Sequence, residues 1–266
     1  MLHISTLAIM INMVILVSMH NRSFNLIDIH SHILPGIDDG SRSMSMSIEM
    51  AKQAVQIGIT HMICTPHIHP GYFDNDDSSI KPVFSDLQQA LIREKVPLTL
   101  TYGAEVRVSE QIPEWISNNE IPFLGRFNSK KVLLLEMPHS HVPVGIEMLI
   151  KWLLSKNVLP VIAHPERNRE LLAEPWKLDH LRRTNAIFQL TAGSVTGRFG
   201  EKVQAFSRSL VRSKKIDIVA SDTHNLTKRP NDMGIAYDFV SSIDQEFAKK
   251  VFFITPSQIV SSSNDF

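Results

Sequence analysis

The chain has 266 residues, of which 43% are hydrophobic and 20% charged, a composition typical of a globular protein with a substantial core. Its 27 Lys and Arg balance 27 Asp and Glu, so the overall charge favours neither a nucleic-acid partner nor an anionic membrane surface. The single cysteine, Cys64, excludes an intramolecular disulfide and fits a reducing cytoplasm, where we expect the protein to act.

Residues 1–25 form an apolar extension ahead of the first predicted strand. Residues 7–19 are apolar apart from Asn12 and Ser18, which makes the run shorter than the roughly 20 residues of a membrane-spanning helix. The basic region of a signal peptide and a small-x-small cleavage site are both missing. A weak anchor and a true start at Met19 stay open. We favour a disordered or over-extended N-terminus without stable membrane insertion.

Strand, polar loop and helix alternate about seven times along the rest of the chain. The predicted strands cover residues 26–29, 59–64, 98–102, 131–135, 158–163, 186–190 and 216–220. The predicted helices cover residues 43–57, 79–94, 113–118, 144–156, 176–183, 201–213 and about 234–249. This alternation is typical of a parallel α/β fold. Because no repeat, low-complexity segment or long linker interrupts it, we expect one domain over residues 26–266.

The first predicted strand leads into two histidines, His30 and His32, and then into a Pro/Gly loop with Asp38 and Asp39. At strand spacing both imidazoles point to the same side of the chain. Two imidazoles aimed at one point suit a divalent metal ion, to which Asp38 or Asp39 could add an oxygen ligand. Taken alone, His-x-His is equally compatible with a polar strand face.

Further histidines and carboxylates follow the later predicted strands. They are His67 after the second, Glu105 after the third, Glu136 after the fourth, His164 after the fifth, and Asp222 and His224 after the seventh. The carboxyl ends of parallel strands converge on one face, which in a barrel carries the active site. One polar residue at a strand end is often only a loop hydrogen-bonding group. Together with His30, His32 and Asp39, these residues make nine candidate ligands at the same end of six strands, and so many in one place predict a metal site.

The predicted ligand set contains imidazoles and carboxylates but no thiolate, which argues against a closed structural zinc site. It suits two or three ions such as Mn²⁺, Fe or Zn²⁺, with Mg²⁺ as a further candidate. Clustered divalent ions generate hydroxide from water near neutral pH and hold both the attacking and the leaving oxygen of a phosphoryl transfer.

Two arginines near these positions indicate a phosphate substrate. Arg167 lies three residues beyond His164, and Arg229 five beyond His224. Guanidinium groups bind phosphate oxygens bidentately, although without the metal cluster ordinary surface salt bridges would explain both residues. Cys64 is not followed by the arginine of a C-x5-R loop, and no phosphate-binding glycine motif is present, so cysteine-phosphatase chemistry and nucleotide binding are disfavoured.

A set of short runs carries a family resemblance. They are Asp28 to Gly40, Thr65-Pro66-His67, Gly103-Ala104-Glu105, Ala163-His164-Pro165-Glu166-Arg167-Asn168, Thr191-Ala192-Gly193-Ser194 and Ala220-Ser221-Asp222-Thr223-His224-Asn225. From about residue 26 to the C-terminal tail, the chain resembles the bacterial metal-dependent protein-tyrosine phosphatases. These belong to the polymerase-and-histidinol-phosphatase (PHP) superfamily and are often encoded with capsule or exopolysaccharide genes. The chain departs from this family in its N-terminal extension, in the loop after His67 and in its tail.

The resemblance implies a distorted seven-stranded (β/α) barrel of the TIM-like PHP type that holds three metal ions, usually manganese. It implies ligand sets of His30, His32, Glu105 and Asp222 for one ion, Glu105, His67 and His164 for a second, and Asp39 and His224 for a third, with Glu105 bridging. Asp38 is not expected to bind metal and is interpreted as a loop residue or as a residue that supports a ligand from behind.

The resemblance also implies a proton-handling carboxylate at Glu136 and substrate-binding arginines at Arg167 and Arg229; whether Glu136 touches metal stays open. The implied reaction is attack of metal-bound hydroxide on phosphotyrosine in proteins. The family substrate is typically the Tyr-rich tail of a bacterial tyrosine autokinase that controls polysaccharide export. A small-molecule phosphatase of the histidinol-phosphate type is the alternative, and a binding module without turnover has no need for so many ligands.

Overall fold

The structure, a computed structural model, describes residues 25–261. The expectations for the N-terminal extension, a weak anchor or a disordered segment, concern residues that lie outside this range except for Asn25. Within the range, none of the helices combines the length and the apolar character needed to cross a bilayer.

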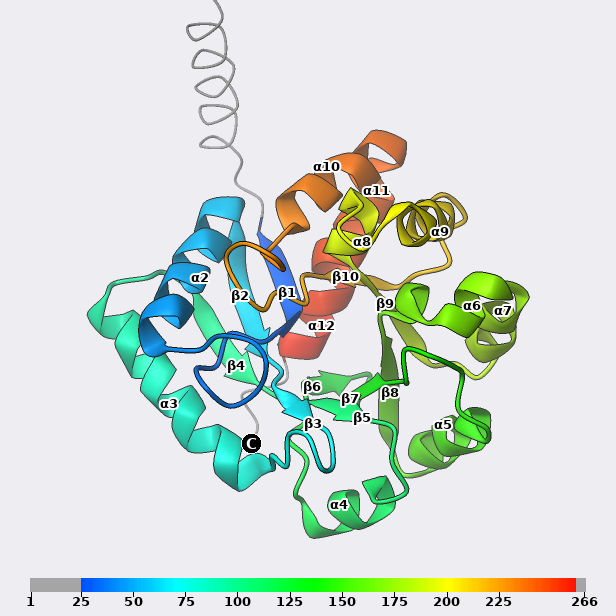
Figure 1. Ribbon diagram of the computed structural model, residues 1–266, viewed down its shortest axis with the longest axis horizontal. Helices are drawn as coiled ribbons and strands as arrows, with labels where there is room; N and C mark the ends of the chain where they lie inside the picture. The colour runs from blue at the N-terminus through cyan, green and yellow to red at the C-terminus, as the bar shows by residue number, and fades with distance from the viewer. Residues whose placement is uncertain (1–24, 262–266) are drawn as a thin grey trace, which may run out of the picture.

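The strands form two sheets, arranged as a broken barrel (Figure 1). In the smaller sheet the order is β1 (Leu26–Ser31), β2 (Ile59–Cys64), β4 (Thr99–Tyr102). In the larger sheet the order is β10 (Ile218–Ala220), β9 (Ile187–Thr191), β8 (Val158–Ala163), β7 (Lys130–Glu136), β5 (Glu105–Arg107), β3 (His67–Ile68). These pairs are all parallel, and β6 (Gly125–Phe127) adds an antiparallel pair with β7.

The two sheets meet where β1 lies beside the end of β10. The backbone N–H of Asp222 donates to the carbonyl of His30 at 2.8 Å, and that of His32 donates to Thr223 at 2.9 Å. These bonds bring the first and last strands of the barrel together. The predicted parallel α/β barrel is confirmed, with one difference. The second and third predicted strands correspond to β2 and β4 of the smaller sheet, and each is followed by a further short strand, β3 or β5, that was not predicted and joins the larger sheet.

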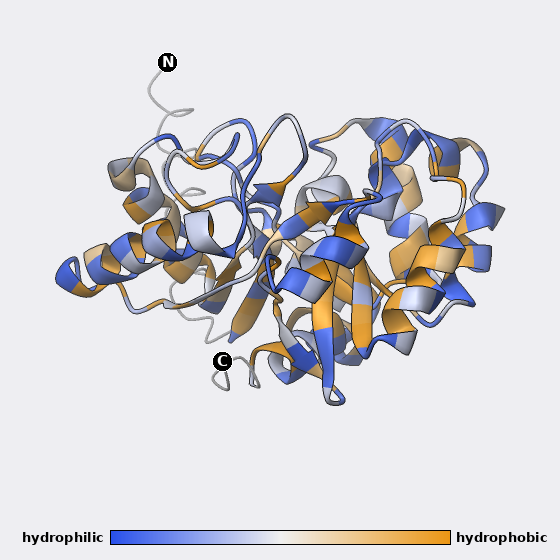
Figure 2. Cartoon of the chain, turned by 90° about the horizontal axis from the view of Figure 1, so that it is seen from below, coloured by the Kyte–Doolittle hydropathy of each residue, from blue (hydrophilic) through white to orange (hydrophobic). Residues whose placement is uncertain are grey.

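Most of the helices lie around the outside of the barrel, whereas the last ones, drawn in red, cross behind its centre (Figure 1). In chain order they are α2 (Met44–Ile57), α3 (Asp77–Arg93), α4 (Ile112–Asn118), α5 (Ile146–Ser155), η1 (Pro165–Arg167), α6 (Arg169–Ala173), α7 (Trp176–Arg182), α8 (Ala192–Thr196), α9 (Glu201–Arg212), α10 (Met233–Ile243), α11 (Gln245–Lys249), η2 (Lys250–Ile254) and α12 (Thr255–Val260). Figure 2 shows the strands of the larger sheet as mostly hydrophobic. A buried cluster that includes Ile29, Ile63, Leu134 and Val161 fills the space between the strands, which places the core beneath the polar ends of the same strands.

Most predicted elements agree with the structure to within two residues, but the last predicted helix, 234–249, is divided. α10 ends at Ile243, and the Asp244 side chain then accepts a hydrogen bond from the backbone of Phe247 at 2.9 Å and caps α11. Aspartate favours such a capping position over a helix interior because its carboxylate satisfies a free backbone N–H. The apolar periodicity continues across this break, which is why the sequence pattern alone merged the two helices.

Candidate metal centre

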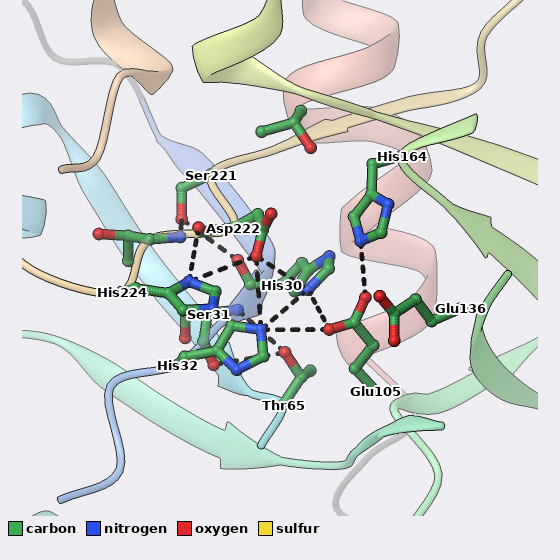
Figure 3. Close-up of polar contacts among 12 residues, drawn as sticks. His30, Ser31, His32, Thr65, Glu105, Glu136, His164, Ser221, Asp222 and His224 are labelled. Carbon is green, nitrogen blue, oxygen red and sulfur yellow. Dashed lines mark hydrogen bonds and ion pairs between the residues drawn. The ribbon is translucent and has the colours of Figure 1, made fainter. Parts of the chain in front are cut away.

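The predicted ligands converge at the carboxyl ends of the strands, and Figure 3 shows all of them except Asp39 and His67. Three overlapping groups have ligand atoms that all lie within 4.8 Å of one another. These groups are His30, His32, Glu105 and Asp222; His67, Glu105 and Glu136; and His32, Asp39, His67 and His224. His164 stands beside them, with Nε2 2.8 Å from Oε1 of Glu105. All of the residues that the sequence suggested as ligands are therefore in one place.

The most buried of these groups surrounds the two histidines of β1. The Nε2 atoms of His30 and His32 lie 3.2 Å apart, so strand alternation does aim both imidazoles at one point. Oε2 of Glu105 is 3.2 Å from His30 and 3.3 Å from His32, and Oδ1 of Asp222 is 3.4 Å from each. Four ligand atoms thus enclose one position that is shielded from solvent.

Each of three imidazoles is held at its Nδ1 atom by an acceptor behind it. Nδ1 of His30 lies 2.9 Å from Oε1 of Gln189, and Nδ1 of His32 lies 2.7 Å from Oδ2 of Asp38. Nδ1 of His224 lies 3.0 Å from the carbonyl oxygen of Asp222. An acceptor at Nδ1 keeps the proton there and leaves the Nε2 lone pair for the ligand cluster, as metal-binding histidines require. This geometry separates the two candidate aspartates, because Asp38 supports a histidine while the neighbouring Asp39 reaches the cluster.

His67 lies between two of the groups. Its Nδ1 atom is 3.1 Å from Oε2 of Glu105, and its Nε2 atom is 3.4 Å from Oδ1 of Asp39. On the far side, Nε2 of His224 is 3.3 Å from the same Asp39 oxygen. Glu136 approaches His67 from the other direction, with Oε2 4.0 Å from Nδ1. An ion beside Asp39 would therefore have both His67 and His224 within reach, and Glu136 stands beside the group around Glu105.

Burial and neighbouring charges shift the pKa values of the residues in this cluster. Burial alone would raise the pKa of Glu105, but the neighbouring His30 and His67 hold it well below its usual range. Burial, reinforced by Arg167, lowers the pKa of His164 to about 3. Burial, reinforced by His32, lowers the pKa of His224 to about 4. Both of these imidazoles are therefore neutral near pH 7, which is the form that binds a metal ion.

The donor set fits divalent cations. Among the described residues, several side-chain atoms at this place are buried without a hydrogen-bond partner: Nδ1 of His67, Oε2 of Glu105, Oε2 of Glu136, Oδ1 of Asp222 and Nε2 of His224. Buried polar atoms are rarely left without a partner, because each costs the free energy of its desolvation. Cations that accept lone pairs account for the four of these atoms that belong to His67, Glu105, Asp222 and His224.

Both predicted arginines lie at the cluster and contact the same carboxylate. Oδ2 of Asp222 accepts from Arg167 at 2.5 Å and from Arg229 at 2.7 Å. The Arg167 guanidinium also stands over the ring of Phe199, 4.9 Å from its centroid. The Nε atoms of both arginines are buried without a partner, so each keeps a donor for a further anion. Side-chain exposures of 49% for Asp39 and 28% for Arg229 open this side of the cluster to solvent.

Backbone strain marks two of the candidate ligands. His164 has a φ of 31° and Asp222 a φ of 52°. These values lie in the left-handed region, which residues other than glycine seldom adopt. Such conformations persist where the surrounding structure enforces them, and they concentrate at functional sites. Behind His164, Glu166 accepts from the backbone of Thr191 at 3.1 Å and from Oγ of Ser194 at 2.6 Å. The Thr191–Ser194 run thus fixes the His164 loop.

Two residues of the site were not found from the sequence. Arg107 forms an ion pair with Oε1 of Glu136 at 3.0 Å and donates to the carbonyl of Met137 at 3.2 Å. It lies two residues after Glu105 on β5, so strand alternation could have placed it on the same side. Gln189, which holds His30, is the one amide side chain inside the apolar strand β9, and that contrast was its only signal.

Comparisons with known proteins agree with this geometry. The profile of the family described as capsular polysaccharide synthesis, CpsB/CapC, matches residues 26–261. Tyrosine-protein phosphatase YwqE of Bacillus subtilis is 41% identical over 204 residues, which cover 77% of this chain and 79% of the relative. A solved structure from a study of YwqE and CpsB of Streptococcus pneumoniae, "unique metal-dependent tyrosine phosphatases", superposes with a TM-score of 0.82 at 36% identity over 91% of this chain and 96% of that one. A mutant organophosphorus hydrolase shares only the fold, with a TM-score of 0.56 at 10% identity over 90% and 93% of the two chains.

Proposed function

The chain belongs to the capsular polysaccharide synthesis family CpsB/CapC, whose members include metal-dependent tyrosine phosphatases, and we propose that it hydrolyses phosphotyrosine on proteins. The observation that carries this proposal is the meeting of a buried histidine–carboxylate cluster with two arginines. The cluster offers ligand atoms for several cations, and Arg167 and Arg229 add fixed positive charge at its edge. A phosphate monoester matches both parts of such a site.

Manganese is the ion that we propose, in up to three positions. His30, His32, Glu105 and Asp222 would hold one ion. Glu105 would be shared with a second, beside His67, His164 and Glu136, and Asp39 and His224 would hold a third. Divalent ions bound together in this way activate water for attack and neutralise charge on the phosphate. Iron, zinc and magnesium are the other ions that accept such a ligand set.

The two arginines would bind and orient the phosphate. Arg167 is fixed from three directions, by Asp222, by the ring of Phe199 and by the tight turn that follows His164. Arg229 reaches the same carboxylate from the loop after β10 and is the more exposed of the two. A guanidinium held in place loses little conformational freedom when it binds a phosphate oxygen. Both arginines are therefore suited to stabilise the negative charge that develops on the phosphoryl oxygens during the reaction.

Glu136 would carry the proton that the leaving tyrosine oxygen needs. Burial, together with the nearby Glu105, raises the pKa of Glu136 and favours a protonated carboxyl group. Arg107 fixes one of its oxygens, Oε1, while the other, Oε2, has no partner and faces the cluster. A proton on Oε2 is therefore positioned for transfer. A covalent phosphocysteine is not expected, because Cys64 is buried and burial raises the pKa of its thiol.

For the physiological substrate we propose the Tyr-rich tail of a bacterial tyrosine autokinase that controls capsule or exopolysaccharide synthesis in the cytoplasm. Membership of the capsular polysaccharide synthesis family supports this choice. The solvent exposure of Asp39 and Arg229 supports it too, because a tyrosine on a flexible tail can reach the phosphate site from that side. A kinase tail is a disordered segment that one phosphatase can approach at many tyrosines in turn.

The test compares hydrolysis of a phosphotyrosyl peptide with hydrolysis of histidinol phosphate, each with added Mn²⁺ and after exhaustive treatment with EDTA. We expect Mn²⁺-dependent release of phosphate from the peptide that is lost with EDTA and returns with Mn²⁺. Orthovanadate, which mimics the phosphoryl group in cysteine phosphatases, is added in a parallel reaction, so that its inhibition can be compared with that by EDTA. Activity that survives complete removal of metal contradicts the proposed chemistry, and a preference for histidinol phosphate moves the function to the small-molecule class.

A further inference from the structure

An open strand edge lies on the side of the barrel, away from the metal centre. β4 pairs with β2 and, within residues 25–261, with no other strand. In a closed barrel its other edge would face the N-terminal half of β7. That half of β7 instead pairs with β6, which sets Gly125 opposite Val132 and Phe127 opposite Lys130. The hairpin of β6 and β7 therefore leaves β4 as the last strand of the smaller sheet (Figure 1).

A cavity of about 470 Å³ borders this edge, and we call it the β4 groove. On one side it is lined by Leu100, Thr101 and Tyr102 of β4 and by the α3 residues Lys81 and Phe84. On the other side it is lined by Asn119, Ile121, Pro122 and Phe123 and by Lys131 of β7. Its volume falls within the roughly 300–1,000 Å³ of most binding pockets. None of its lining residues belongs to the metal-binding groups.

The backbone of β4 directs hydrogen-bonding groups into the β4 groove. Gly103 donates to the carbonyl of Cys64 on β2 at 2.9 Å. Successive residues of a parallel strand face alternate neighbours, so Leu100 and Tyr102 direct their N–H and C=O groups away from β2. These groups border the cavity, where an incoming extended chain can pair with them. Such an edge is the usual acceptor for strand addition by a peptide.

The side chains of the β4 groove define which peptide fits. Lys81 and Lys131 bring two ammonium groups, and neither forms an ion pair with a carboxylate among the described residues. Lys131 lies over the ring of Phe123, 4.9 Å from its centroid. Asp77, the one carboxylate in the lining, already accepts a hydrogen bond from the Tyr102 hydroxyl at 3.1 Å. Unpaired cations beside aromatic walls suit acidic residues next to aromatic ones.

We propose that the β4 groove binds an extended peptide with alternating acidic and aromatic residues, which adds a parallel or antiparallel strand to β4. Its backbone pairs with Leu100 and Tyr102, its carboxylates share one face of the strand and lie near Lys81 and Lys131, and its rings lie on the opposite face. This is a second binding site on the molecule, for a polypeptide partner, and it needs neither a phosphate group nor the metal ions.

The experiment measures fluorescence anisotropy of fluorescein-labelled Glu-Tyr-Glu-Tyr-Glu-Tyr amide with the full chain loaded with Mn²⁺. The peptide carries no phosphate, so its binding is separate from any phosphatase activity. Lys81→Glu and Lys131→Glu are compared with Lys151→Glu, which changes an exposed lysine on α5. We expect each groove variant to weaken binding about three- to tenfold, because each replaces an attraction by a repulsion near the surface. The Lys151→Glu variant should bind like the unaltered chain.

A second peptide, methylated on the backbone nitrogen of every other residue, tests strand addition, because it keeps the side chains and loses the N–H groups that would pair with β4. The methylation is made in both alternate registers, which gives two peptides. We expect at least one of them to bind about tenfold more weakly than the unmethylated peptide. The proposal is overturned if both methylated peptides bind as tightly as the unmethylated peptide, if both groove variants bind the peptide as tightly as the unaltered chain does, or if the unaltered chain does not bind the peptide. Hydrolysis of p-nitrophenyl phosphate should stay unchanged in both lysine variants, which separates this outcome from misfolding and from the proposed phosphatase function.

Discussion

Arg167 donates to Oδ2 of Asp222 at 2.5 Å, while the other oxygen of the same carboxylate lies 3.4 Å from the Nε2 atoms of His30 and His32. One oxygen of Asp222 thus faces the ligand cluster and the other faces the arginines. The proposed phosphate site and the proposed metal site therefore share a residue. A substitution that affects phosphate binding can be distinguished from one that affects metal binding only if the metal content and the activity of each variant are both measured.

The first prediction concerns Arg167→Ala. We expect kcat/KM for a phosphotyrosyl peptide to fall about 10²–10³-fold, the usual effect of removing one donor to developing negative charge. The Mn²⁺ content, measured by atomic emission, should stay unchanged, because Arg229 still holds Asp222. The matched control is Arg183→Ala, which alters an exposed arginine at the end of α7. If the Mn²⁺ content falls together with activity, Arg167 acts by supporting Asp222 and not by binding phosphate.

The second prediction concerns Gln189, whose Oε1 atom lies 2.9 Å from Nδ1 of His30. Gln189→Leu removes the acceptor that holds the imidazole, and we expect Mn²⁺ affinity to fall roughly 10–100-fold, as is typical for groups that orient metal ligands. Gln189→Glu keeps an acceptor at the same place and should bind Mn²⁺ within a few-fold of the unaltered chain. Isothermal titration with Mn²⁺ measures both. Equal loss in the two variants would contradict the proposal that an acceptor at Nδ1 of His30 is what supports metal binding.

The third prediction concerns the stability of the metal-free chain in acid. Burial, with the nearby His32, lowers the pKa of His224 to about 4, against roughly 6.5 in an unfolded chain. As the pH falls from about 6.5 towards 4, the unfolded chain binds a proton at this residue that the folded chain does not, so the free energy of unfolding decreases. His224→Gln removes this proton-binding group, so the free energy of unfolding should decrease less steeply as the pH falls.

Urea unfolding in the presence of a chelator, repeated between pH 4 and pH 7, measures this slope. The exposed His141, changed to glutamine, serves as control and should leave the slope as it is. The same slope in His224→Gln as in the unaltered chain would mean that this imidazole is protonated in the folded state without its metal.

The fourth prediction concerns Cys64, which is fully buried on β2. Cys64→Ala should keep kcat and KM for a phosphotyrosyl peptide, because the proposed reaction uses no thiol. It should cost about 1 kcal/mol of stability through lost packing. Thermal unfolding and steady-state kinetics measure the two effects, and N-ethylmaleimide should leave the activity of the folded enzyme intact. A loss of kcat in a variant that folds and binds Mn²⁺ normally would contradict the metal-based reaction.

The fifth prediction concerns Gly40, which lies against His32. A Cβ atom at residue 40 would overlap both the carbonyl oxygen and the Cβ atom of His32. Gly40→Ala should therefore displace this histidine, lower the stability by about 1–3 kcal/mol and weaken Mn²⁺ binding. At Gly36, with a φ of 71°, a Cβ atom would meet nothing within 4 Å. Gly36→Ala should lower stability through backbone strain alone and leave Mn²⁺ affinity unchanged. Equal Mn²⁺ affinities in the two variants would refute this role of Gly40.

The sequence predicted those parts of the site that depend on local geometry. His30 and His32 could be placed together because strand alternation needs no knowledge of the rest of the fold. The shared direction of parallel strands then brought His164 and Asp222 to the same face. Arg107 and Gln189 were missed because their roles depend on which side chain stands opposite, Glu136 in one case and His30 in the other. Such pairings arise only when distant strands meet.

The division of the barrel into two sheets was also beyond the sequence. The run from residue 98 to residue 107 reads as one strand followed by a polar end, but Gly103 and Ala104 interrupt it. A Cβ atom at Gly103 would meet Leu124, so close packing at that point depends on the loop before β6. Whether β4 or β6 pairs with β7 is decided by this tertiary contact, and nothing in the hydrophobic pattern distinguishes the two.

The hydrogen bonds between β1 and the end of β10 have a consequence for how the protein is made. His30 and His32 leave the ribosome early, whereas Asp222 and His224 come almost two hundred residues later. Until that last strand emerges, the histidines of β1 lack half of their partners, and the barrel lacks the seam that joins its two sheets. Contacts of such long sequence separation form late and slowly. Tight binding of the proposed metal ions would therefore mark a finished polypeptide, and an incompletely synthesised chain would be left without them.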